Sequence, residues 1–143
     1  MSRAPRVLFG IGAAVSLLTA FAHLAGQLAP QPPPSSEAEA ALRKLMETVA
    51  LPLPGATRTA RDLLSGFGFL MSTFHLVVGI LSFVLLRRLR EDAAALRSVA
   101  VVLAGGFGVL VGISLRYFFV VPTAFFAAAF VAYALSAGLF RPR

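Results

Sequence analysis

The chain has 143 residues, of which 58% are hydrophobic and 13% charged, whereas a soluble domain averages about 45–50% apolar and about 25% charged residues. So much apolar surface in so short a chain excludes a soluble domain and a disordered protein, and the lack of cysteine excludes a disulfide scaffold and thiolate metal sites. A net charge of +7 is typical of proteins that bind nucleic acid or a membrane surface, so the positions of the charges must decide between the two.

Four apolar runs are long enough to cross the ~30 Å of hydrocarbon in a bilayer, which takes about 20 residues. They occupy residues 7–28, 63–86, 99–119 and 123–140. The predicted fold is therefore all-α, a four-transmembrane-helix bundle that forms a single membrane domain over residues 1–143. The first run exceeds the roughly 7–15 apolar residues of a signal peptide, and the chain begins at Met1, so we expect an uncleaved span.

Residues 29–62 form the one sizeable segment outside the predicted spans. Prolines at positions 30, 32, 33 and 34 predict a stiff, extended start. Ser36 and Glu39 then fit a Ser-x-x-Glu capping box, and Pro52 and Pro54 end the helical pattern that follows. Its apolar residues recur at helical spacing: Ala38, Ala41, Leu42, Leu45, Met46 and Val49. We expect a short amphipathic helix that lies on the membrane surface, caps the bundle mouth or serves only as a connector.

The distribution of charge predicts the orientation of the bundle. With the N-terminus inside, the cytoplasmic face carries a net +6, the outer loop is neutral, and Arg116 within the third span supplies the last unit. The cytoplasmic charges are Arg3, Arg6, Arg87, Arg88, Arg90, Arg97, Arg141 and Arg143, with Glu91 and Asp92. The positive-inside rule therefore predicts a multi-pass protein with both termini cytoplasmic. Topology and attraction to anionic lipid explain the charge, so we expect membrane lipids, and no nucleic acid, as partners.

Small and polar residues predict which side of each span faces the bundle interior, because membrane helices approach one another through small side chains. The predicted inward residues are Ser16, Thr19, His23 and Gln27; Ser65, Gly68, Ser72, His75, Gly79 and Ser82; Gly105, Gly108, Gly112 and Arg116; and Ala129, Tyr133 and Ser136. The polar members are biased toward the outer half, which predicts a pocket that opens outward. Gly108 and Gly112 also form a GxxxG pattern that offers a seam for a homodimer.

Arg116 is the most informative residue, because an ionised side chain inside a span is costly and marks a functional site by default. It either snorkels to the outer headgroups, holds the bundle together through His23, Gln27 or a backbone carbonyl, or binds an anionic or carbonyl-bearing ligand such as a lipid headgroup or a quinone. The predicted ligand-binding residues are Arg116, His23, Gln27 and Tyr117 around the polar head, with Ser72 and His75 at the floor.

His23 and His75 raise haem as the alternative, since two facing imidazoles in a helical bundle can hold haem iron. Their estimated depths differ by roughly 7 Å, and no second basic residue accompanies Arg116 for the propionates. Zinc would have only two nitrogen ligands, and apart from Asp62 at a border the spans hold no carboxylate for a proton relay or a catalytic triad. We therefore expect a non-enzymatic protein that binds an amphiphile, or an accessory subunit of a larger membrane complex.

The stretch from Gly66 to His75 with Gly79, and the stretch from Leu115 to Phe119 that leads through Pro122, resemble an uncharacterised family of small bacterial four-helix membrane proteins. The resemblance covers nearly the whole chain. It implies the four-helix fold, brings no known activity, and draws attention to His23, His75 and Arg116. We accordingly expect a multi-pass protein of a bacterial inner membrane.

Overall fold

The computed structural model describes residues 3–140, so that Arg141 and Arg143, two of the predicted cytoplasmic charges, lie outside the described residues. The elements in chain order are α1 (Ala4–Leu28), α2 (Glu37–Thr48), β1 (Ala50–Leu53), β2 (Ala56–Thr59), α3 (Ala60–Arg88), α4 (Ala93–Tyr117) and α5 (Val120–Leu139). Helices α1, α3, α4 and α5 are each long and apolar enough to cross a membrane. The chain is a small four-span membrane protein with a helical bundle, as predicted.

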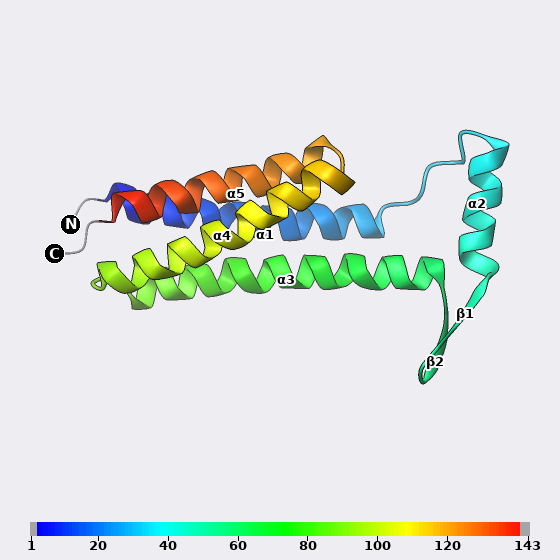
Figure 1. Ribbon diagram of the computed structural model, residues 1–143, viewed down its shortest axis with the longest axis horizontal. Coiled ribbons are helices and arrows are strands. Elements are labelled where there is room, and N and C mark those ends of the chain that lie inside the picture. The colour runs from blue at the N-terminus through cyan, green and yellow to red at the C-terminus, as the bar shows by residue number, and fades with distance from the viewer. Residues whose placement is uncertain (1–2, 141–143) are drawn as a thin grey trace.

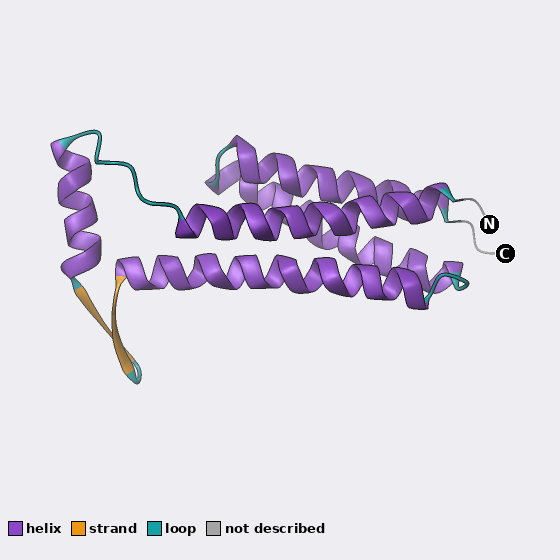
Figure 2. Cartoon of the chain, turned by 180° about the vertical axis from the view of Figure 1, so that it is seen from behind, coloured by secondary structure: helices purple, strands orange, loops and turns teal. Residues whose placement is uncertain are grey.

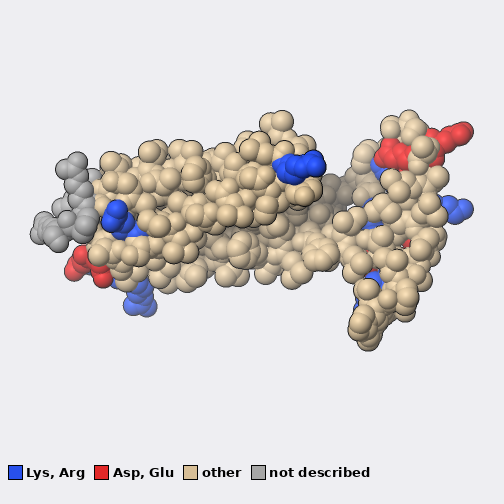
Figure 3. All heavy atoms as spheres, in the orientation of Figure 1, with Lys and Arg blue, Asp and Glu red and all other residues tan. Residues whose placement is uncertain are grey.

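The bundle has two distinct ends (Figure 1). The terminal end carries the start of α1, the finish of α5 and the α3–α4 turn, and the loop end carries α2 and the β1–β2 hairpin. On the face drawn in Figure 3, charged side chains gather toward these two ends, and apart from one Lys or Arg side chain near the α4–α5 turn the stretch between them is uncharged. An uncharged belt between charged ends is the surface that a bilayer requires.

Helix α1 occupies the middle of the bundle. It packs against α3 on one side and α5 on the other, and α4 packs mainly against α5. Helices α3 and α4 are joined by a tight turn at the terminal end and then diverge (Figures 1 and 2). Both α1 and α3 continue past the α4–α5 turn toward the loop end, so among the described residues α1 and α3 form this end of the bundle.

Two of the span boundaries differ from the sequence prediction because of capping side chains. Helix α4 begins at Ala93, six residues before the apolar run, since the Asp92 carboxylate accepts a hydrogen bond of 2.8 Å from the Ala95 amide. Helix α3 begins with a reciprocal capping box. The Asp62 amide donates to Thr59 Oγ1 at 3.1 Å, and the Thr59 amide donates to Asp62 Oδ2 at 2.9 Å. Such caps satisfy amides that have no partner within the helix.

Helix α3 confirms the predicted small and polar face. Its buried residues are Gly68, Ser72, His75, Gly79 and Ser82, five of the six predicted, and Ser65 is half-buried. The face packs tightly against α1. A Cβ atom added to Gly79 would lie 2.6 Å from Leu17 Cδ2 and 3.1 Å from the Ala13 carbonyl oxygen, so the close approach of these helices requires glycine at this position.

The predicted inward face of the third span is wrong. The buried residues of α4 are Leu96, Ala100, Ala104, Phe107 and Ser114. Gly105, Gly112 and Arg116 are exposed, and nothing lies within 4 Å of a Cβ atom added to either glycine. Only Gly108 of the predicted set approaches α5, where an added Cβ would lie 3.3 Å from Phe130. The contact with α5 is filled by alanine and larger side chains, so it does not need a glycine stripe.

Tyr133 of α5 lies at the centre of the core. Its ring meets Phe9 of α1 edge to face, with centroids 5.4 Å apart, and stacks on Phe107 of α4 at 5.7 Å. Its hydroxyl donates to Ser82 Oγ of α3 at 3.1 Å. One side chain therefore contacts the three other spans. Ser136, one turn further on, donates to the Pro5 carbonyl at 2.8 Å and ties α5 to the start of α1.

The loop between the first two spans contains a β-hairpin that the sequence analysis did not predict. Strands β1 and β2 pair antiparallel, from Ala50 opposite Thr59 to Leu53 opposite Ala56. The turn uses Pro54 and Gly55, and Gly55 has a φ of +79°, which favours glycine. The predicted amphipathic helix is present as α2, with Ser36 as its N-cap, and it lies across the loop end of the bundle (Figure 1).

Candidate functional site

Four of the six predicted ligand-binding residues meet where α1 packs against α3. Gln27 of α1 covers Gly68 of α3 so closely that a Cβ atom on Gly68 would collide with the Gln27 amide. Ser72, one turn further along α3, is buried and donates its hydroxyl hydrogen bond to the Gly68 carbonyl at 3.1 Å. His23 lies one turn before Gln27, so the antiparallel register brings it level with Ser72.

His75 is fully buried beneath this pair. Its Nδ1 atom lies 2.9 Å from the Met71 carbonyl oxygen. Because that oxygen can only accept, Nδ1 carries a proton, and in the neutral imidazole Nε2 presents a lone pair. The ring stacks on Phe126 at 5.5 Å and meets Phe107 at 6.1 Å. Within residues 3–140, Nε2 is buried and has no hydrogen-bond partner.

His23 is half-buried, and its Nε2 atom is likewise buried and unpartnered among the described residues. Two ring nitrogens without partners thus lie on adjoining helices, near Ser72. Buried polar groups in proteins are almost always hydrogen-bonded. These two nitrogen atoms are therefore the place in the spans where a bound molecule could supply a missing hydrogen bond.

Arg116 and Tyr117 lie in the last turn of α4, and both are exposed. The Arg116 guanidinium lies 5.6 Å from the centre of the Tyr117 ring. In the part of the chain that the structure describes, no hydrogen bond joins Arg116 to His23 or Gln27. The arginine therefore lies on the outer side of the bundle, while His75 is buried inside it and His23 is half-buried.

The depth of Arg116 nevertheless matches that of His23. Ser114 and Thr123 share a hydrogen bond of 2.7 Å between α4 and α5, and α5 runs antiparallel to α1 from the Ser136–Pro5 bond outward. Counting residues along these pairings places the α4–α5 turn near the level of His23. His23 and Arg116 thus lie at about the same level of the bundle, but His23 lies at the α1–α3 interface and Arg116 on the outer side of α4.

The surface formed by the described residues is hollowed in at least two places. One, of about 90 Å³, lies between α1 and α3 and is lined by Ala20, Phe21, Leu24, Phe69, Ser72, Thr73 and Leu76. The other is an open groove of about 390 Å³ on α4 near the terminal end, lined by Ala94, Arg97, Ser98, Val101 and Val102. Of these two, the smaller hollow adjoins the predicted site, through Ser72, and its lining is mostly apolar.

The surroundings of the two histidines do not fit haem. The rings of Phe74, Phe107 and Phe126 occupy the space around His75. The adjoining hollow of about 90 Å³ is lined by neither histidine, so it offers no space in which a porphyrin ring could reach both imidazoles. Within residues 3–140, no group of three or more His, Cys, Asp or Glu side chains that could hold a metal ion occurs.

The half of the bundle near the terminal end holds more polar contacts than the sequence predicts. The hydrogen bonds of Tyr133 to Ser82 and of Ser136 to Pro5 lie there and join α5 to α3 and α1. Gly12, which lies against the Tyr133 ring, was not among the predicted residues. Ser82, Tyr133 and Ser136 do belong to the predicted inward faces. What the sequence did not predict is which of these faces contact one another.

No family model, curated protein or solved structure matches this chain. The resemblance to small bacterial membrane proteins therefore rests on the residues quoted for it, and no family is assigned. The four apolar helices by themselves identify the chain as a small multi-pass membrane protein.

Proposed function

We propose that this protein binds the polar end of a lipid-like or quinone-like amphiphile, without catalysing a reaction, at the level of the α4–α5 turn. The observation that carries the proposal is the pair of buried, unpartnered imidazole nitrogens, Nε2 of His23 and Nε2 of His75. Leaving a buried polar atom unpaired costs about 1–3 kcal/mol. A ligand that donates or accepts a hydrogen bond there would recover this free energy.

The chemistry of the neighbouring side chains supports a ligand with a polar head and an apolar tail. The lone pair on His75 Nε2 calls for a hydroxyl donor, as in a quinol or a glycerol-based lipid. Gln27 offers both a donor and an acceptor. The apolar hollow beside Ser72 accepts a segment of tail, and Arg116 with Tyr117 offers a cation at the same depth for a phosphate or carbonyl oxygen.

The orientation is part of the proposal. The terminal end carries Arg3, Arg6, Arg87, Arg88, Arg90 and Arg97, which the positive-inside rule assigns to the cytoplasm. The His23 level then lies in the outer leaflet of a bacterial inner membrane. Cysteine labelling tests this directly, because the chain has no native cysteine. A Ser35→Cys variant should react with an impermeant maleimide in intact cells, and a Glu91→Cys variant should not.

Mass spectrometry of the purified protein tests the binding of an amphiphile. Organic extracts of wild type, His23→Ala, Arg116→Ala and the control Arg58→Ala, an exposed arginine of the hairpin, are compared after purification in mild detergent. We expect one enriched amphiphile in wild type and the control, and its loss in the other two variants. An identical lipid complement in all four samples would contradict the proposal.

An absorption spectrum of the same preparation separates this proposal from its redox alternative. A Soret band that disappears in both His23→Ala and His75→Ala would replace amphiphile binding with haem binding. The accessory-subunit alternative is supported by the exposed glycines of α4, Gly105 and Gly112, against which a second copy or another membrane helix would pack closely. A larger complex recovered by crosslinking in native membranes, and lost with Gly112→Leu, would support it.

A further inference from the structure

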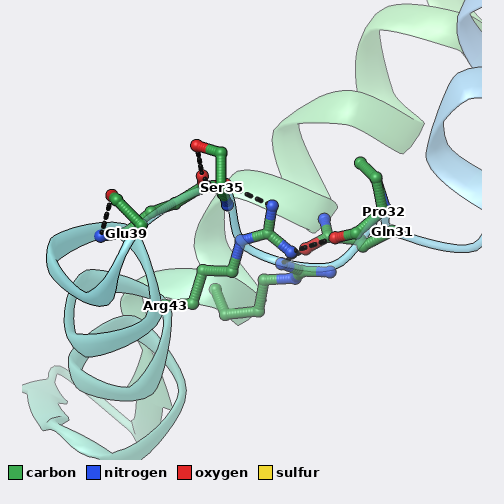
Figure 4. A network of polar contacts seen from close by, with 7 residues as sticks. Gln31, Pro32, Ser35, Glu39 and Arg43 are labelled. Carbon is green, nitrogen blue, oxygen red and sulfur yellow. Dashed lines mark hydrogen bonds and ion pairs between the residues drawn. The ribbon is translucent and has the colours of Figure 1, made fainter.

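Helix α2 is fixed in its position across the loop end by a network of polar contacts (Figure 4). The Ser35 amide and hydroxyl donate to Glu39 Oε2 at 2.8 and 2.6 Å. Arg43 pairs with Glu39 on the next turn and donates to the Pro32 carbonyl at 2.6 Å. These contacts bind the start of α2 to the proline-rich segment that leaves α1.

A second contact connects that segment to the neighbouring span. Arg61, in the first turn of α3, donates to Gln31 Oε1 at 2.9 Å. The hairpin joins the other end of α2 to α3. Because α2 is held through both of its connections, its axis stays across the direction of the spans (Figures 1 and 2), and so parallel to the plane of a membrane that the spans cross.

Within residues 3–140, no part of the protein buries the apolar face of α2. No residue of α2 is buried, and the half-buried ones are Glu39, Arg43 and Met46. The apolar residues Leu42 and Leu45 are each 57% exposed, and Val49, directly after the helix, is 47% exposed. The capping network thus uses one side of the helix and leaves these three side chains uncovered.

The length of α3 places this exposed face at the headgroups. Its 29 residues, at about 1.5 Å per residue, span roughly 43 Å, which matches the 40–45 Å of a bilayer with its headgroups. With Arg87 and Arg88 at one surface, the other end of α3 reaches the opposite headgroup layer. Helix α2 lies beside that end. A helix lying in this plane meets the boundary between headgroups and acyl chains.

The charges of α2 identify the kind of contact. The helix carries three acidic residues and two basic ones, so it has no net attraction for anionic lipid. Insertion of apolar side chains must supply the affinity. The contact should therefore depend little on ionic strength or on the fraction of anionic lipid, unlike that of a polybasic surface helix.

We propose that α2 is an interfacial helix whose apolar face, formed by Leu42, Leu45 and Val49, inserts into the leaflet at the loop end and anchors the protruding ends of α1 and α3 there. The partner is the lipid surface itself. This role is independent of amphiphile binding at the His23 level, since none of the three residues belongs to that site.

Fluorescence quenching by brominated lipid tests the proposal, because the full chain contains no tryptophan. Single reporters are Leu45→Trp on the apolar face and Ala40→Trp, an exposed control on the polar side of the same helix. Both variants are reconstituted in phosphatidylcholine vesicles with bromines near the headgroup end of the acyl chains. Circular dichroism and gel filtration confirm that both are folded.

We expect the Leu45→Trp emission to be quenched by brominated lipid about twofold more than that of Ala40→Trp, and to be shielded from aqueous iodide. The difference should persist when half of the lipid is phosphatidylglycerol or when salt is raised. Equal quenching of the two reporters would overturn the proposal. Shielding of Leu45→Trp from iodide without bromine quenching would also overturn it, because the face would then be covered by protein. Amphiphile extraction is unaffected in either outcome.

Discussion

Tyr133 lies against the backbone of Gly12, and a Cβ atom added at position 12 would be 2.7 Å from the phenol Cζ. The absence of a side chain on α1 therefore makes room for the largest fully buried side chain of the core. The same ring contacts Phe9 and Phe107 and donates to Ser82. The packing of all four spans thus depends on one glycine and one tyrosine.

Gly12→Ala should destabilise the protein by about 1–3 kcal/mol, because a rigid aromatic ring surrounded by other helices has to shift to accept the methyl group. Thermal unfolding in detergent, followed by circular dichroism, measures the effect. The control is Gly26→Ala on the same helix, where nothing lies within 4 Å of the added atom and higher helix propensity should raise stability by up to ~1 kcal/mol. Equal changes in both variants would contradict the Gly12–Tyr133 contact.

Tyr133→Phe should cost about 0.6 kcal/mol, the average of interhelical hydrogen bonds in membrane proteins, and at most ~1.7 kcal/mol. The ring still fills its place, so only the bond to Ser82 is lost. A double-mutant cycle with Ser82→Ala, measured by unfolding in mixed micelles, isolates the coupling. Strictly additive effects would show that the 3.1 Å contact contributes nothing.

Gly79→Val should lower the stability of the protein and Gly112→Val should not, although both place a branched side chain in a span. The Gly79 variant collides with Leu17 and the Ala13 carbonyl oxygen and should lose about 1–3 kcal/mol of stability. The Gly112 variant points into open space and should leave monomer stability unchanged. Unfolding midpoints in detergent give the comparison. A destabilised Gly112 variant that also changes its oligomeric mass would identify the α4 glycines as a subunit contact.

Glu39 should titrate far below an ordinary glutamate. Hydrogen bonds from the Ser35 side chain and amide, and then from Arg43, lower its pKa from 4.5 to about 2. Because the folded-state pKa is depressed, the stabilisation that this carboxylate contributes is present above pH 4.5 and is lost as the pH falls toward 2. The Glu39 carboxyl resonance in NMR should therefore have its midpoint near 2. In Ser35→Ala the midpoint should rise, and a wild-type midpoint near 4.5 would exclude the network.

Features set by local sequence could be predicted from the sequence alone. The four spans follow from the length of apolar runs, because the bilayer imposes that length on each helix separately. Helix α2 follows from Ser36, Glu39 and the spacing of its apolar residues. The buried face of α3 could be predicted from its row of small and polar residues. Small residues let two helix backbones approach closely, so they mark the face that contacts a neighbouring helix.

Features that depend on which helix packs against which face could not be predicted from the sequence. The glycines of α4 have the same spacing as a contact face, yet α4 meets α5 and the aromatic core through Ala100, Ala104 and Phe107. Arg116 therefore faces outward while His23 and His75 face inward, and Gly12 gains its role only from the ring of Tyr133. Periodicity along one helix identifies its candidate faces, but the choice among them depends on the shapes of the other helices, which only the tertiary structure brings together.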